Sequence, residues 1–295
     1  MSDYVLSCCS TIDLSHEWIE RRDVACVLFN YELDGEPCKD DFGLTHPPAD
    51  LYARMLAGAS AKTSQVSVGE YAAHFKPFLE AGKDVLHVTL SSGISSTYNS
   101  ACVARDQLAE EFPNNKVVVV DSLAASSGYG LLMDRLCDLR DGGMGIDELA
   151  QWTLDHRLEL QHWFFSSDLT FFIRGGRISK ASGIMGGLLK ICPVMNVAYD
   201  GTLQVREKIR TKGKAIKRVI EKMAELAQGG VDYDGKVYIC QSECLADATA
   251  VADGIYKKFG HINGEIEIFP IGAVIGSHTG PGTIALFFWG SPRKD

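Results

Sequence analysis

The sequence predicts an α/β protein made of two α/β domains, residues 1–160 and 161–295, with a ligand site between them. The first domain is expected to hold a mainly parallel sheet, because short apolar runs alternate there with helix-period runs. The second is expected to hold a mixed sheet with helices, because a hairpin signal and further strands follow one another there. A length of 295 residues and a hydrophobic content of 46% suffice for two buried cores.

In the first half, strands are predicted at the apolar runs that begin at Val5, Val24, Val85 and Lys116. Helices are predicted between and after them, from about Ala49, Val68, Thr97, Ser126 and Ile146. Apolar strands of four residues that alternate with helices are typical of a parallel sheet buried on both faces. Ligands of such sheets bind just past the carboxyl ends of the strands.

In the second half, strands are predicted at HWFFSS, KVYICQ, GEIEIFPI and IALFFW. The segment 191–209 reads as a hairpin, because Asp200-Gly201 is a strong turn signal. Helices are predicted over 179–190, which is rich in small residues, over 212–228, and over the run LADATAVADGIYKKF.

Composition excludes several classes of function. A net charge of −9 argues against binding to nucleic acid, whose phosphates favour a positive surface. The chain has no apolar run of about 18 residues and no signal peptide, so a soluble cytoplasmic protein is expected. Nine scattered cysteines suit reduced thiols rather than a disulfide framework.

Cofactor motifs are also missing. The segment 230–237 nearly matches a phosphate-binding loop, but it ends in Val237 where magnesium needs a hydroxyl. No G-x-G-x-x-G follows a strand, H-E-x-x-H is absent and the histidines are dispersed. We therefore expect no metal and no nucleotide cofactor.

Hydroxyl side chains are concentrated between Ser91 and Thr97, where five of seven residues carry one. Ser95 resembles the nucleophile of a serine esterase with His278 as its base, but the G-x-S-x-G pattern ends in Thr97 instead of glycine. Ser96 or Thr97 alone would serve as a helix cap. So many hydroxyls at a helix N-terminus indicate an anion site.

Three further segments carry groups suited to an anion. Thr63 and Ser64 lie in a predicted turn, and Arg177 follows two glycines in FFIRGGRIS. His278 lies in VIGSHTGPGT, where flanking glycines allow the backbone to come close to another group. We predict a glycine-flanked turn there.

Six segments together resemble the DegV family of bacterial fatty-acid-binding proteins, which includes the binding subunits of the fatty acid kinase system. They are STIDL, the TSQ segment at Thr63, SSGISSTYNSA, the DS at Asp121, RGGRISKASGIMGGLLKICPVM and HTGPG. The resemblance implies that a long-chain fatty acid lies between two α/β domains with its acyl chain in an apolar tunnel. It assigns the carboxylate to Thr63, Ser95, Arg177 and His278. Neighbouring candidates for additional contacts are Ser64, Ser96, Thr97, Thr279 and Gly280.

The acyl chain is expected against Ile184, Met185, Leu188 and Leu189 of the small-residue helix. Three residues depart from the family pattern. Cys9 replaces an aspartate, Val66 replaces a proline after TSQ, and Ser96 replaces a glycine. The first is expected to alter a polar network near the head group, and the other two to change turn geometry and ligand preference.

The resemblance implies a non-catalytic carrier that needs no cofactor. It would present the fatty acid to a separate ATP-dependent kinase subunit, which phosphorylates the carboxylate for phospholipid synthesis. Between Arg206 and Lys222 the chain has eight basic and two acidic residues. This stretch is interpreted as a solvated helix face, or as a docking surface for the kinase or for anionic lipid. A serine esterase and a lipid-sensing regulatory protein are the alternatives in function.

Overall fold

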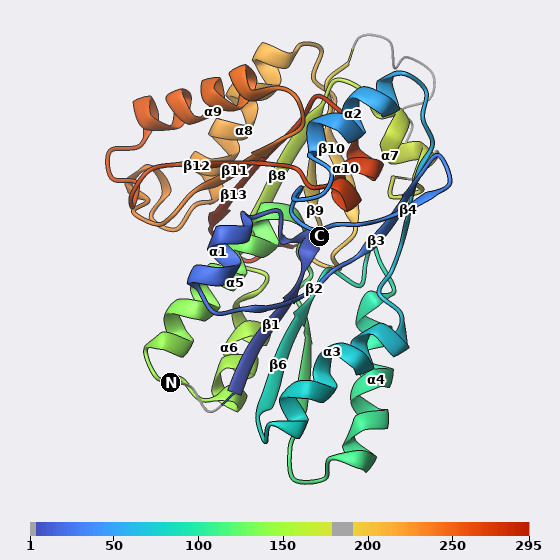
Figure 1. The fold of residues 1–295 in the computed structure, drawn as a ribbon. Helices are drawn as coiled ribbons and strands as arrows, with labels where there is room; N and C mark the ends of the chain where they lie inside the picture. The colour runs from blue at the N-terminus through green and yellow to red at the C-terminus, as the bar shows by residue number, and fades with distance from the viewer. Residues whose placement is uncertain (1–3, 179–190, 295) are drawn as a thin grey trace.

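The computed structural model describes residues 4–178 and 191–294 of the chain (Figure 1). The small-residue helix predicted over 179–190, with Ile184, Met185, Leu188 and Leu189, lies outside the described residues. The described residues form three sheets covered by helices. No described helix has the length and apolar character that crossing a membrane requires.

A parallel sheet of four strands organises the first half of the chain, in the order β2-β1-β6-β7. Its strands are β1 (Tyr4–Cys9), β2 (Ala25–Val27), β6 (Asp84–Thr89) and β7 (Val117–Asp121). Helices follow the strands in sequence: α1 (His16–Arg21), α3 (Val68–Glu80), α4 (Thr97–Glu111), α5 (Ser126–Asp141) and α6 (Ile146–His156). The parallel sheet predicted from its apolar strands is therefore confirmed.

A mixed sheet of six strands organises the second half, in the order β10-β9-β8-β13-β11-β12. Its strands are β8 (Leu160–Ser166), β9 (Val194–Val197), β10 (Leu203–Glu207), β11 (Tyr238–Gln241), β12 (Glu267–Pro270) and β13 (Thr283–Trp289). β9 and β10 pair antiparallel around Asp200-Gly201, so the predicted hairpin is confirmed. The helices α8 (Lys212–Leu226) and α9 (Leu245–Lys258) cover one face of this sheet.

A third sheet was not predicted. It is antiparallel, in the order β4-β3-β5, and consists of β3 (Asn30–Leu33), β4 (Glu36–Lys39) and β5 (Ala61–Ser64). Asp34 and Gly35 both have positive φ in the turn between β3 and β4, as a tight two-residue hairpin requires. The segment that holds Thr63, predicted as a turn, is thus an edge strand.

Short elements complete the fold: α2 (Pro48–Leu56), α7 (Thr170–Arg174), α10 (Ala273–Thr279) and the 3-10 helices η1 (Ser10–Ile12) and η3 (Gly230–Asp232). α10 packs against α2, α7 and the three-stranded sheet. His278 lies in the last turn of α10, so the prediction of a turn at this residue was wrong. Gly280 and Gly282, which follow the helix, have the positive φ expected of a glycine turn.

Alternation along the strands gives the six-stranded sheet two different faces. Trp163, Phe165, Leu286 and Phe288 belong to the core beneath α8 and α9. Their neighbours Phe164 and Phe287 point to the opposite face, toward the first half of the chain. This second face is a wall of the site described next.

Candidate functional site

A cavity of about 780 Å³ lies between the carboxyl ends of the parallel strands and the six-stranded sheet. Much of its wall is apolar and comes from alternate residues of the strands. The main apolar lining residues are Phe29, Leu90, Phe164, Phe172, Val197, Leu203, Val205, Ile271, Val274, Ile275, Ala285 and Phe287. This part of the wall suits an apolar part of a ligand.

The four residues assigned to the carboxylate, Thr63, Ser95, Arg177 and His278, all line this cavity, although they lie far apart in the chain. Among the additional candidates, Ser64, Ser96 and Thr279 line it too. Thr97 and Gly280 lie behind the lining. Thr97 is fully buried, and the Gly280 backbone packs on the Phe171 ring.

His278 is held between two partners. Its Nδ1 lies 3.4 Å from Nη1 of Arg177, and its Nε2 lies 2.7 Å from Oγ1 of Thr63. A guanidinium only donates hydrogen bonds, so Nδ1 accepts and the ring hydrogen resides on Nε2. His278 therefore donates to Thr63, whose own hydroxyl hydrogen is left for another acceptor.

The hydroxyl of Ser95, like that of Thr63, accepts a hydrogen bond from the protein. The backbone N–H of Thr97, in the first turn of α4, donates to Oγ of Ser95 over 3.3 Å. Ser96 is the N-cap residue, but its side chain makes no capping hydrogen bond. Ser95 thus satisfies a helix amide with a lone pair, and its hydroxyl hydrogen is left to donate into the cavity.

Arg177 contributes the positive charge. Its Nη1 donates to the carbonyl of Gly175 over 2.7 Å and its Nε to the carbonyl of Ile94 over 3.3 Å. Nη2 has no partner among the residues that the structure describes. Burial lowers the pKa of Arg177, but an arginine keeps its charge at neutral pH.

The charge on Arg177 and burial together keep His278 neutral. Burial is the larger cause and the neighbouring guanidinium the smaller one, and they lower the pKa of His278 from 6.5 to about 4. At neutral pH the cluster therefore holds one positive charge and several neutral donors. An anion with only acceptor atoms complements this set.

Glycine at 175 allows His278 to approach the chain. A Cβ placed there would lie 2.3 Å from Nδ1 of His278. Gly176 has a φ of +71°, which favours glycine and turns the chain so that Arg177 faces the same cavity. Steric and backbone constraints therefore explain the two glycines in the local sequence RGGR.

The other end of α10 lies beside two buried carboxyl groups, Asp13 and Asp40, and Asp40 anchors it. Oδ1 of Asp40 accepts from the N–H of Ala273 over 3.2 Å, and Oδ2 accepts from the hydroxyl of Ser10. Burial raises the pKa of Asp40 to about 6, and burial with the nearby Asp40 raises that of Asp13 further above its ordinary value. Asp13, in the segment STIDL, accepts from Ser126. This anchor fixes the helix that carries His278.

The geometry offers Ser95 no histidine base. Both ring nitrogens of His278 face Thr63 and Arg177, and Ser95 contacts a helix amide instead. Among the described residues, no cluster of three or more His, Cys, Asp or Glu side chains is placed to hold a metal ion. The arrangement is thus suited to hold an anion by hydrogen bonds and one charge.

Several lining residues were not anticipated from the sequence. They include His162 and residues of the two strands of the hairpin, β9 and β10. The period-two pattern of the runs HWFFSS and TIALFFW contains a signal for part of this set, since every second residue faces the cavity.

Comparison with known proteins identifies the family. A profile described as "Uncharacterised protein, DegV family" matches residues 9–290. The DegV domain-containing protein YteA of Lactococcus lactis is 34% identical over 94% of both chains, and a DegV domain-containing protein of Clostridium perfringens is 30% identical over 100% of both.

Solved structures agree with this result. A fatty-acid-binding DegV family protein from Thermus thermophilus has a TM-score of 0.85 at 28% identity, covering 97% of this chain and 99% of its own. A DegV lipid binding protein from Thermotoga maritima has a TM-score of 0.82 at 27% identity over 100% of both chains. The fatty acid kinase B3 protein of Streptococcus pneumoniae, solved with linoleic acid, shares the fold at 21% identity with a TM-score of 0.83, covering 98% of this chain and 99% of its own. By sequence and by fold, this chain belongs to the DegV family.

Proposed function

We propose that this protein binds a long-chain fatty acid, with the carboxylate at Thr63, Ser95, Arg177 and His278. One observation carries the proposal. The hydroxyls of Thr63 and Ser95 each accept a hydrogen bond from the protein, so that both hydrogens remain for a ligand. A carboxylate has acceptors only, and these two donors with Arg177 compensate the cost of removing it from water.

The acyl chain would lie along the apolar wall of the cavity. Phe164 of β8, Leu203 of β10 and Phe287 of β13 belong to this wall, and burying methylene groups against such side chains is favourable. The relatives support the assignment, because structures from Thermus thermophilus and Thermotoga maritima are described as fatty-acid-binding and lipid-binding. Polar donors on one side of the cavity and apolar strands on the other fit one amphipathic ligand.

We further propose that the protein is a carrier in the cytoplasm and not a complete enzyme. It would position the carboxylate for a separate ATP-dependent kinase subunit, which supplies nucleotide and magnesium. The fold shared with the kinase-system protein of Streptococcus pneumoniae supports this role. We also propose a domain boundary at residue 160, and the change from the parallel to the mixed sheet at β8 supports it.

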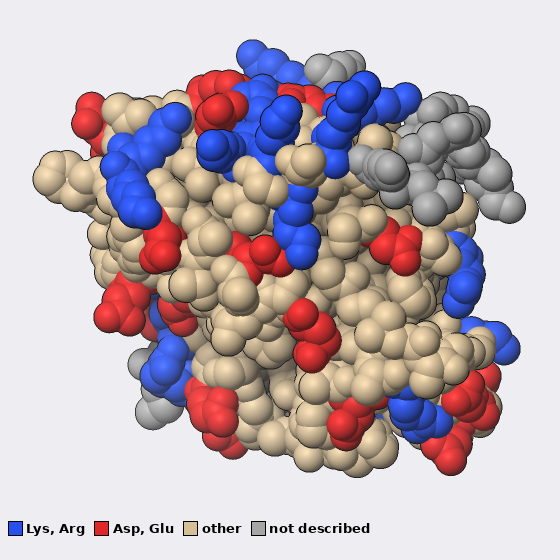
Figure 2. All heavy atoms as spheres, turned by 90° about the horizontal axis from the view of Figure 1, so that it is seen from above, with Lys and Arg blue, Asp and Glu red and all other residues tan. Residues whose placement is uncertain are grey.

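The kinase subunit would dock on basic side chains of the β10–α8 segment. Lys and Arg side chains gather along one margin of the face seen in Figure 2. Within the segment, Arg218 pairs with Glu207 over 2.7 Å and Lys212 with Asp247 over 2.7 Å. Three other residues are exposed and have no acidic partner in the described part of the chain: Arg210, Lys214 and Lys217. These three supply the charge for an acidic partner surface.

Mass spectrometry of the lipid that co-purifies with the protein tests the proposal. We expect a long-chain fatty acid at close to one molecule per chain. A delipidated protein that binds no labelled fatty acid would contradict the proposal. Covalent labelling of Ser95 by a fluorophosphonate, with turnover of an activated ester, would indicate a serine esterase instead.

A further inference from the structure

Tyr71 of α3 connects two of the segments that carry the hydroxyl donors. α3 begins at Val68, shortly after Thr63 on β5, and Ser67 caps it in a capping box with Glu70. The Tyr71 hydroxyl lies 2.7 Å from Oγ1 of Thr97, the first residue of α4. Tyr71 therefore joins the start of α3 to the start of α4.

The next contact leads to the cavity. Thr97 is fully buried, and its backbone N–H donates to Oγ of Ser95. The direction of this N–H decides which lone pair of Ser95 is used, and hence where the hydroxyl hydrogen points. A side-chain bond from Thr97 to Tyr71 holds the first turn of α4 in one orientation. Without it, Thr97 would leave a buried hydroxyl unpaired or rotate.

A longer chain of polar groups supports Tyr71 from behind. Its hydroxyl lies 3.4 Å from Sγ of Cys9, which lies 3.7 Å from Nε2 of His87. Further hydrogen bonds connect His87 to Ser7 and Ser7 to His74. Burial raises the pKa of Cys9 to about 12, lowers that of His74 to about 4 and lowers that of His87 well below 6.5. These buried polar groups are thus uncharged at neutral pH, and they affect the site only by holding Tyr71 in place.

We infer that the hydroxyl of Tyr71 is a positioning group for Ser95, acting through Thr97. The inference rests on the proposed function, because Ser95 is positioned for a ligand carboxylate. Cys9, which replaces the family's aspartate, lies directly behind Tyr71. A neutral thiol is a weak partner for a phenol, so the strong hydrogen bond of Tyr71 goes to Thr97. The altered polar network expected from the sequence is therefore connected to Ser95 through Tyr71 and Thr97.

A double-mutant cycle tests the inference. Tyr71→Phe, Ser95→Ala and the double variant are compared by the Kd for a fluorescently labelled stearic acid and by Tm. Tyr71→Phe keeps the stacking of the ring on Phe75. We expect Tyr71→Phe to weaken binding about three- to tenfold, as loss of one hydrogen bond predicts. In the Ser95→Ala background, the same change should have no further effect.

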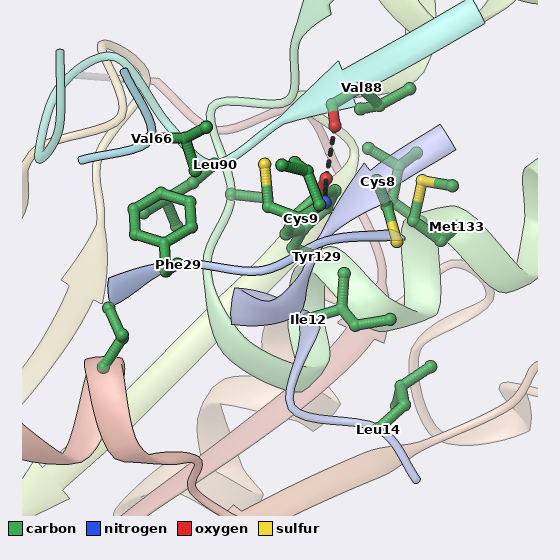
Figure 3. Close-up of a cluster of buried hydrophobic side chains, with 14 of the residues drawn as sticks. Cys8, Cys9, Ile12, Leu14, Phe29, Val66, Val88, Leu90, Tyr129 and Met133 are labelled. Atoms are coloured by element: carbon green, nitrogen blue, oxygen red, sulfur yellow. Dashed lines mark hydrogen bonds between the residues drawn. The ribbon is translucent and has the colours of Figure 1, made fainter. Parts of the chain in front are cut away.

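Tyr129→Phe is the matched control. Tyr129 is also fully buried and bonded through its hydroxyl, which donates to Val88 and accepts from the N–H of Cys9 (Figure 3). Its hydroxyl makes no bond to the Ser95 turn among the described residues. We expect this variant to lower Tm and to leave Kd unchanged.

Two results would overturn the inference: a Kd for Tyr71→Phe equal to that of the parent, or a full additional loss in the Ser95→Ala background. If Tyr71→Phe does not fold, Thr97→Val provides the same test from the other partner, and Thr97→Ser should restore binding. Should Ser95→Ala itself bind as tightly as the parent, the proposed carboxylate site fails, and this outcome is separate from a failure of Tyr71 alone.

Discussion

Nε2 of His278 lies 2.7 Å from Oγ1 of Thr63, and the two residues are 215 positions apart in the chain. This contact joins α10 to the edge strand β5 across one end of the cavity. Because Arg177 occupies the other ring nitrogen, the histidine hydrogen is committed to Thr63. The neutral imidazole of His278 thus orients the hydroxyl of Thr63, which can then donate its hydrogen to a ligand.

The first prediction concerns the Thr63 hydroxyl. Thr63→Val keeps the shape of the side chain and removes the donor, so we expect fatty-acid affinity to fall about tenfold, the range for a hydrogen bond to a charged group. Isothermal titration with a long-chain fatty acid measures the change. Thr63→Ser should retain most of the affinity. Thr249→Val, on the exposed side of α9, is the control and should bind like the parent.

The second prediction concerns the charge. Arg177→Ala should weaken fatty-acid binding more than loss of one neutral donor does, because the carboxylate then has no compensating charge in a partly buried site. Unfolding by heat should change little, since no described acidic side chain pairs with Arg177. Arg174→Ala is the matched control: Arg174 is exposed, three residues earlier, and stacks on Phe171. Equal affinity of parent and Arg177→Ala would show that the head-group site is wrong.

Part of this site was foreseeable from the sequence, and the reason is local. The alternation of strands and helices, the Asp200-Gly201 hairpin and the start of α4 at Thr97 follow from short-range patterns, and all three are confirmed. The convergence of four distant side chains on one cavity followed only from the family resemblance. Composition and periodicity alone were consistent with several functions for each of these four residues.

The two failed predictions, at α10 and at the third sheet, have different causes. α10 has seven residues, too few to be stable as an isolated helix, and its first turn is held by Asp40, 233 residues away. A pattern of neighbouring residues cannot predict a hydrogen-bond partner so far away in the sequence. The third sheet is different, because Asp34-Gly35 carries the same local turn signal as Asp200-Gly201. The bond of Tyr71 to Thr97 is visible only once two helices are placed side by side.

The third prediction concerns pH. The pKa of His278 is lowered from 6.5 to about 4 in the folded protein. Between these values the unfolded chain binds the proton and the folded chain does not, so stability falls as pH drops. From pH 7 to pH 5 this residue should remove about 2 kcal/mol from the free energy of unfolding. His278→Gln should lack that share of the pH dependence.

Urea unfolding of the delipidated parent and of His278→Gln at pH 7 and pH 5 measures this share. Asp40, whose pKa is raised to about 6, acts in the opposite direction, because its folded form binds the proton more tightly than the unfolded chain. Asp40 is present in both proteins, so the difference between them isolates His278. Identical pH dependence in the two proteins would mean that folding does not lower the pKa of His278.

The fourth prediction concerns the basic surface. Reversing two exposed charges, Lys214→Glu with Lys217→Glu, should slow phosphorylation of the bound fatty acid at limiting kinase subunit and leave the Kd for the fatty acid unchanged. Charges at the rim of an interface act mainly on the association rate, so added salt should reduce the difference. Lys257→Glu with Lys258→Glu, at the exposed end of α9, is the control. A loss of equal size in both double variants would point to net charge rather than to this surface.

The fifth prediction concerns the glycine beneath His278. In Gly175→Ala, the new methyl group would lie 2.3 Å from Nδ1 of His278 and 3.2 Å from the carbonyl of Phe171. The ring must move, because the backbone of α7 is held by its own hydrogen bonds, and Nε2 then leaves Thr63. Fatty-acid affinity should fall about as far as in Thr63→Val, with only a small change in Tm. Gly69→Ala, in α3, meets no atom within 4 Å and should leave binding unaltered. Parent-like affinity in Gly175→Ala would mean that the contact between His278 and Thr63 is dispensable, and that the hydroxyl of Thr63 is oriented by another group.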